Sequence, residues 1–167
     1  EPIEWMLLTT VEVTTLEQAE QCIRWYGKRW GIEVYHRTLK SGCRIEDRRL
    51  GDAHSLEACI AVDMVVAWRV FLLTMQSREH PELPCDAVLS EDEWRTLCVF
   101  YTQKLPPNPP PMKEIIVLIA KLGGFLGRVR DGNPGTETVW RGLWRLTDIT
   151  IGFKAAEELY RRAGPFP

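Results

Sequence analysis

The stretch "ACIAVDMVVAWRVFLLTM" (58–75) decides what kind of fold this chain can form. It is long and almost wholly apolar, but Asp63 and Arg69 interrupt it. A membrane-spanning helix needs about 20 mostly apolar residues and rarely tolerates charges within them. We therefore predict a buried core helix from about 56 to 77, capped by Ser55, and no membrane contact.

The segments on either side of this helix also favour helices. Two capping boxes, Thr15 with Gln18 and Ser90 with Glu93, predict helix starts, because each pair satisfies backbone N–H groups in a first turn. The predicted helices cover about 16–40, 90–101 and 112–124, with one or two more from 136 onward.

One segment favours a strand. The β-branched and apolar residues of "EWMLLTTVEV" (4–13) predict extended structure. Because a single strand cannot form a sheet, two fold classes stay open. Either the protein is almost all helical, or it is the end of a larger α/β domain.

Positive charge is concentrated in one part of the chain. Residues 22–50 hold eight basic and three acidic side chains, a net charge of +5, while the other residues hold 13 basic and 20 acidic ones, a net charge of −7. Such an island on an acidic body favours a polyanionic partner. The five cysteines include no Cys-x-x-Cys pair, so reduced thiols are expected rather than a zinc or disulfide framework.

Within this island, "YGKRWGIEVYHRTLK" (26–40) places five side chains on one helical face. At about 100° per residue they fall within a stripe of about 80°. The five are Tyr26, Arg29, Glu33, Arg37 and Lys40. One interpretation is a solvated face with ion pairs four residues apart. The other is a phosphodiester site, in which the carboxylate holds a divalent metal and the cations hold phosphates.

Two glycines bear on that choice. Gly27 and Gly31 lie one turn apart in the same predicted helix, and each costs about 1 kcal/mol relative to alanine. Such a cost suggests that another element packs closely against this side of the helix.

The spacing Tyr26, two residues, Arg29, three residues, Glu33, six residues, Lys40 resembles the signature of DDE transposases of the IS-four family, most of all its Tn-five branch. The segments "EPIEWMLLT" (1–9), "KSGCRIEDRRLGDAHSLE" (40–57), "AKLGGFLGRVRDG" (120–132) and "GFKAAEEL" (152–159) also resemble that branch. The likeness covers nearly the whole chain except about 78–112.

The resemblance implies a fold and a domain order. We expect a mostly α chain with one or few β-strands, the C-terminal part of an RNase H-like α/β catalytic domain followed by a helical C-terminal domain. The expected boundaries are 1–78 for the end of the catalytic domain, 79–111 for a helix and the proline-rich connection "PPNPPP", and 112–167 for a dimerisation domain.

The resemblance also implies roles for single residues. Glu33 matches the third metal-binding carboxylate of a catalytic site that holds Mg²⁺ or Mn²⁺. The implied DNA contacts with transposon ends are Tyr26, Arg29, Lys40, Trp5, on which a flipped base stacks, Arg49 and, more weakly, Arg37. Each keeps an alternative: Trp5 in the core, Arg49 on an ordinary surface, Lys40 as a helix-end cation.

Two catalytic aspartates of the family precede the glutamate, whereas Asp47, Asp52 and Asp63 all follow Glu33. We therefore expect that the chain alone does not cleave DNA. Three functions stay open: the C-terminal portion of a cut-and-paste transposase acting on transposon ends and target DNA, a non-catalytic truncated form that inhibits full-length partners, and an unrelated helical module.

The expected partners are DNA and a second copy of the chain, bound through the C-terminal helices, and the expected location is the bacterial cytoplasm, near the nucleoid. Four residues near one face of the last helix, Trp140, Leu143, Trp144 and Ile151, could form either an internal core or this dimer contact.

Overall fold

The computed structural model describes residues 4–163, and these form helices and loops without a β-strand. The elements in order are α1 (Leu16–Lys28), α2 (Trp30–Arg37), the π-helix η1 (Thr38–Gly42), the 3₁₀ helix η2 (Ile45–Asp47), α3 (Ala53–Glu79), the 3₁₀ helix η3 (Cys85–Ala87), α4 (Glu91–Thr102), α5 (Met112–Leu122) and α6 (Thr136–Ala163).

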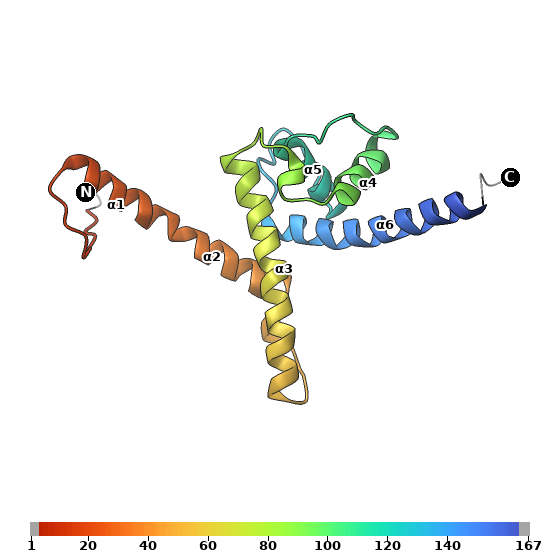
Figure 1. Ribbon diagram of the computed structural model, residues 1–167. Helices are drawn as coiled ribbons and strands as arrows, with labels where there is room; N and C mark the ends of the chain where they lie inside the picture. Colours follow the sequence, from red (N-terminus) through yellow and green to blue (C-terminus); the bar gives the residue numbers. More distant parts are fainter. Residues whose placement is uncertain (1–3, 164–167) are drawn as a thin grey trace.

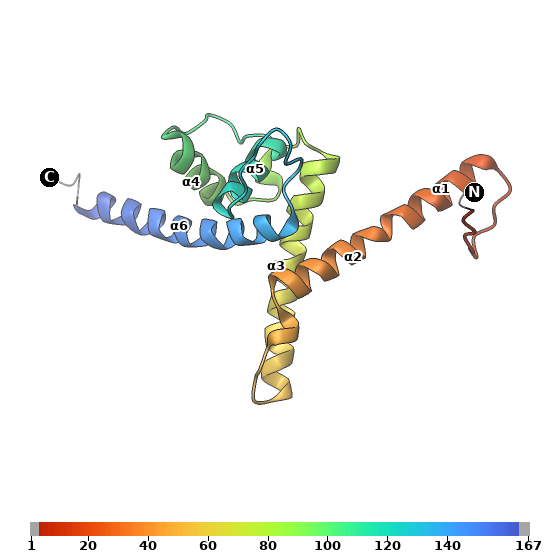
Figure 2. The same cartoon turned by 180° about the vertical axis from the view of Figure 1, so that it is seen from behind.

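The long helix α3 is the axis of the molecule (Figure 1). The α1–α2 arm extends from it to one side and α6 to the other, while α4 and α5 pack in the angle between α3 and α6. The view from behind shows the same arrangement, with both arms projecting beyond the packed centre (Figure 2).

The main hydrophobic core joins α3, α4, α5 and α6. Its fully buried large side chains include Val70, Leu73, Leu97, Ile115 and Leu146. The proline-rich connection runs outside this core, and the Cys85 amide donates to the Pro110 carbonyl at 2.9 Å.

Two glycines set the close crossing of α5 and α6. A Cβ at Gly142 would overlap the carbonyl oxygen of Ile119, and one at Gly123 would overlap that of Thr138. Backbone cannot move aside as a flexible side chain can, so the crossing requires glycine at both positions.

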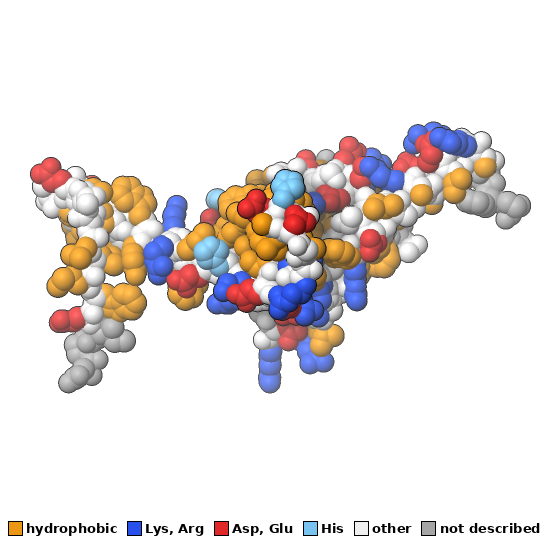
Figure 3. All heavy atoms as spheres, turned by 90° about the horizontal axis from the view of Figure 1, so that it is seen from below, with side chains coloured by type: hydrophobic (Ala, Val, Ile, Leu, Met, Phe, Trp, Pro, Cys, Tyr) orange, Lys and Arg blue, Asp and Glu red, His pale blue; other side chains and the backbone are white. Residues whose placement is uncertain are grey.

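The helix α3 is only partly the buried core helix that the sequence predicts. One side buries Ala67, Val70 and Leu73, while Val62 and Val65 are 65% and 68% exposed. Figure 3 looks toward the first turns of α3 and shows apolar side chains gathered at the centre of that face. Among the helices of the described residues, α3 is the one that is long and apolar enough to cross a membrane, judged by length and composition only.

The mostly helical prediction is confirmed, and the predicted strand is wrong. Residues 4–14 run as coil beside α1, because the described residues hold no second strand with which they could pair. The RNase H-like portion of the predicted fold stays a prediction. The first three and last four residues of the predicted domains lie outside the described residues.

Two local predictions need correction. Asp52, not Ser55, caps α3, and its carboxylate accepts from the Ser55 amide at 2.8 Å. Of the two glycines, only Gly31 is approached closely, since a Cβ there would lie 3.3 Å from the Phe71 ring, whereas Gly27 has open space.

Candidate functional site

The segment 26–40 runs from the end of α1 through α2 into η1, so most of it lies in the exposed α1–α2 arm. Neither α1 nor α2 has a buried residue. Aromatic contacts attach α2 to α3: the Tyr35 ring centroid lies 6.4 Å from those of Trp68 and Phe71, and the Tyr35 hydroxyl donates to the Met64 carbonyl at 3.2 Å. Glu33 lies about 200° around the helix from Tyr35, so it faces away from α3.

The structure brings Tyr26, Arg29 and Glu33 together. The Arg29 guanidinium lies 5.4 Å from the centroid of the Tyr26 ring and 3.2 Å from a Glu33 carboxylate oxygen. The side chains of Arg29 and Glu33 are 53% and 38% exposed. No ion pair joins Glu33 to Arg37 in the part of the chain that the structure describes.

Lys40 lies one element further on, in the π-helix. Its ammonium pairs with a Glu46 carboxylate oxygen at 2.8 Å, so this ion pair leads to η2 and not along the stripe. The neighbouring Thr38 and Leu39 are buried and hold η1 against α3 and α6. The widened helical turn shifts Lys40 relative to the ideal α-helical stripe.

Trp5 and Tyr26 line the same depression, of about 460 Å³, between the N-terminal coil and α1. Trp5 is 75% exposed, so it is not a core residue. Trp25 lines it as well, so the structure places three aromatic side chains around one hollow near Arg29.

The two remaining predicted DNA contacts are exposed. Arg49 donates from one nitrogen to the carbonyls of Glu46 and Arg48, both at 3.2 Å. Arg37 lines a smaller hollow with Ser41 and the first residues of α6. Among the residues that the structure describes, neither arginine has a carboxylate at ion-pair distance.

The three aspartates that follow Glu33 all have structural partners. Asp47 pairs with Arg44 at 2.7 Å, Asp52 caps α3, and Asp63 pairs with Arg48 at 2.9 Å. Residues 4–163 contain no group of three or more His, Cys, Asp or Glu side chains that could hold a metal ion. Glu33 is therefore a single carboxylate, and the described residues do not form a complete metal site.

Sequence reasoning missed two interactions of this basic region, the Lys40–Glu46 pair and the Arg48–Asp63 pair. The second had a detectable signal, because a carboxylate inside an apolar helix requires a charged partner. The sequence did not indicate which of the eight basic residues would supply it.

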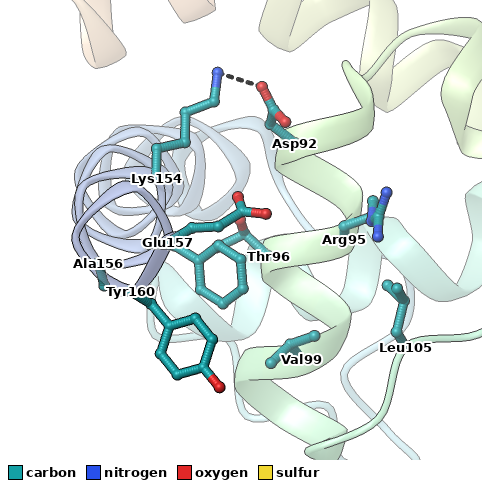
Figure 4. A pocket seen from close by; sticks show the side chains of 10 residues that line it. Asp92, Arg95, Thr96, Val99, Leu105, Lys154, Ala156, Glu157 and Tyr160 are labelled. Atoms are coloured by element: carbon teal, nitrogen blue, oxygen red, sulfur yellow. Dashed lines mark ion pairs between the residues drawn. The ribbon is translucent and has the colours of Figure 1, made fainter. Parts of the chain in front are cut away.

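A groove of about 490 Å³ separates α4 from the outer half of α6 (Figure 4). Its lining includes Phe153, Ala156 and Tyr160 of α6 and Thr96 and Val99 of α4. Lys154 forms an ion pair with Asp92 at its rim, and this pair connects the outer part of α6 to the core.

Beyond Thr150, α6 projects from the core. From Ile151 to Ala163 every residue is exposed except Glu158, which is half-buried. The predicted face divides accordingly: Leu143 is buried and Trp140 is half-buried, while Trp144 and Ile151 are each 63% exposed. Leu159, which is 56% exposed, lies on the same side as Ile151, about 80° around the helix.

A scan against protein-family models matches residues 65–163 to the transposase Tn5 dimerisation domain. The chain belongs to the Tn5 transposase dimerisation-domain family. The Tn5 dimerisation domain thus begins inside α3, ahead of the proline-rich connection, and ends with α6. Its core is the α3–α6 core described above, and its projecting α6 carries the exposed apolar residues. The arm that bears Glu33 precedes the matched region.

Proposed function

We propose that this chain is the C-terminal portion of a cut-and-paste DNA transposase, supplying dimerisation, contacts with transposon-end DNA and one metal-binding carboxylate. The observation that carries this proposal is the family match over 65–163 together with the exposed apolar side of α6. The DNA and metal roles rest on the resemblance of the signature segment.

The dimer contact is proposed for an α6 stripe, which we define as Trp144, Ile151 and Leu159. The 13 residues of α6 beyond Thr150 would be only marginally helical in isolation. Burying one large apolar side chain contributes about 1.5–3 kcal/mol, so pairing this stripe with its copy would stabilise both helices. Such pairing hides apolar surface that a monomer leaves in water.

The transposon-end contact is proposed for the arm and the following loop. Arg29 and Lys40 would bind phosphates on either side of Glu33, with Tyr26 as a further backbone contact. Trp5 would stack on an unpaired base, and Arg49 and Arg37 would extend the basic surface. The ion pairs of Arg29 and Lys40 are exposed and so weak enough to exchange for phosphate.

Glu33 is proposed as one ligand of a site for Mg²⁺ or Mn²⁺. Both are hard cations that take several oxygen ligands, and a two-metal site needs more than one carboxylate. Asp47, Asp52 and Asp63 are engaged elsewhere, and the described residues form no group of metal ligands around Glu33, so no chemical step is assigned to this chain.

A second function is a non-catalytic partner that pairs with and inhibits an intact transposase, and it is equally compatible with the lack of a carboxylate cluster in residues 4–163. The two functions share the dimer and the DNA contacts and differ only in catalysis.

The test is binding of transposon-end DNA followed by a metal-dependent nicking assay. Arg29→Ala and Lys40→Ala should each weaken DNA binding about 5- to 10-fold and make its salt dependence shallower by about one phosphate contact. Unchanged affinity in both variants would exclude the DNA role. Nicking by the wild-type chain with Mg²⁺, lost in Glu33→Gln, would overturn the absence of catalysis.

A further inference from the structure

An ion pair connects the basic loop to the middle of α3. The Arg48 guanidinium donates to both carboxylate oxygens of Asp63, at 2.9 and 3.1 Å, and the same side chain donates to the Cys43 carbonyl at 3.2 Å. A reverse connection exists as well, since the Cys43 thiol donates to the Asp63 backbone carbonyl at 3.5 Å. The loop is thus held to Asp63 of α3 at two points, through the side chain of Arg48 and through the thiol of Cys43.

Asp63 is the buried member of the pair. Its side chain is 11% exposed, against 38% for Arg48, and it lies in the apolar run of α3. Burying a charge is costly even when it is paired, and apolar residues of similar volume often give equal or greater stability than a buried ion pair. Stability alone therefore does not explain why an ion pair occurs here. The two parallel hydrogen bonds fix the orientation of Arg48 relative to α3, which an apolar contact would not do.

The geometry of Arg48 affects its basic neighbour Arg49. Arg49 follows it directly and donates to the carbonyls of Arg48 and Glu46, so the direction of Arg49 depends on the path of the loop. The backbone at Arg44 is left-handed, with a φ of 54°, which is rare for a residue other than glycine and needs surrounding contacts to hold it.

We propose that Arg48 and Asp63 are positioning residues: their ion pair fixes the loop 43–50 so that Arg49 faces bound DNA. Arg48 is turned toward α3 and is not itself a DNA contact. This inference rests on the proposed DNA-binding function of the same region, and it adds two residues that neither the signature nor the family match includes.

The variant Asp63→Asn tests the proposal, because a pure charge effect and a loss of positioning change the DNA affinity in opposite directions. Removing a negative charge near a DNA-binding surface strengthens binding if only the electrostatic field changes. Loss of the positioning contact predicts the opposite, namely binding about 5- to 10-fold weaker with a salt dependence shallower by about one phosphate contact. Glu57→Gln is the matched control, because it makes the same charge change at an exposed position of α3 and should leave affinity equal or slightly higher.

The double variant Arg48→Met with Asp63→Leu separates positioning from stability. It keeps the net charge, and an apolar pair should keep the thermal midpoint of unfolding within a few degrees. The expected result is normal stability with DNA binding weakened as in Asp63→Asn. Normal binding in both this variant and Asp63→Asn would overturn the proposal.

Two further measurements distinguish this proposal from the proposed function. Amide hydrogen exchange of residues 43–50 should become faster in Asp63→Asn while the α5 core is unchanged, a result that does not depend on DNA. Unchanged exchange would contradict the positioning role. If Arg29→Ala and Lys40→Ala leave DNA binding intact, the proposed DNA function is wrong, whatever the loop does.

Discussion

The ammonium group of Lys40 lies 2.8 Å from a carboxylate oxygen of Glu46, and both side chains are more than half exposed, at 59% and 65%. An exposed pair of this kind contributes about 0–1 kcal/mol to stability, so a phosphate can displace the carboxylate. In the proposed DNA-binding function, Glu46 would therefore compete with DNA for Lys40.

We expect Glu46→Gln to raise the affinity for transposon-end DNA about 2- to 5-fold, because it removes this competition and one repulsive charge. Fluorescence anisotropy at fixed salt measures the change. Glu57→Gln carries the same charge change outside the basic loop, and an equal gain in that variant would show that Lys40 is not involved.

The crossing of α5 and α6 predicts opposite results for two glycines of the same helix. Gly142→Ala places a methyl group against the Ile119 carbonyl, and overpacking of this kind costs roughly 1–3 kcal/mol or more. A Cβ at Gly152 would lie in open space, so Gly152→Ala should stabilise the protein by about 0.4–1 kcal/mol through helix propensity. Urea unfolding of both variants measures this, and equal effects would contradict the close crossing.

The Arg69–Glu93 pair predicts loss of stability in acid. Burial raises the pKa of the Glu93 carboxyl, but hydrogen bonds from Arg69 and Ser90 outweigh it and hold the pKa below its usual value. A carboxyl with a lowered folded-state pKa stabilises the protein above the unfolded-state pKa, about 4.3, and this contribution is lost as the pH falls through the folded-state pKa.

Glu93→Gln should therefore destabilise the protein at pH 7 by roughly 1–3 kcal/mol and make unfolding less dependent on pH below about 4.3. Thermal unfolding from pH 7 down to pH 3 tests both expectations. Glu91→Gln, which breaks the exposed pair with Arg95, is the control and should change little.

Local signals in the sequence predicted the helices well. Both capping boxes are present in the structure, with the Gln18 side chain accepting from the Thr15 amide and that of Glu93 from the Ser90 amide. Such signals need only neighbouring residues. The strand predicted for 4–13 is absent, because a strand also needs a second strand with which to pair. The composition of 4–13 does not report whether such a strand exists elsewhere.

The site was predicted in part for a similar physical reason. Helical spacing correctly placed Tyr26, Arg29 and Glu33 together, but it missed the π-helix that moves Lys40 toward Glu46. It also grouped Leu143 with Ile151, although the core ends between them and only Leu143 is buried. Where a long helix leaves its core is a tertiary property, which periodicity does not report.

We propose that this chain pairs with its own copy through the α6 stripe. Sedimentation of the wild type over a range of concentrations, beside Ile151→Arg with Leu159→Arg, tests it most directly, with Glu157→Arg on the opposite side of α6 as the control. The wild type and the control should form a reversible dimer, and the stripe variant should be a folded monomer. A wild type that stays monomeric at high concentration, or a stripe variant that dimerises as the wild type does, would contradict it.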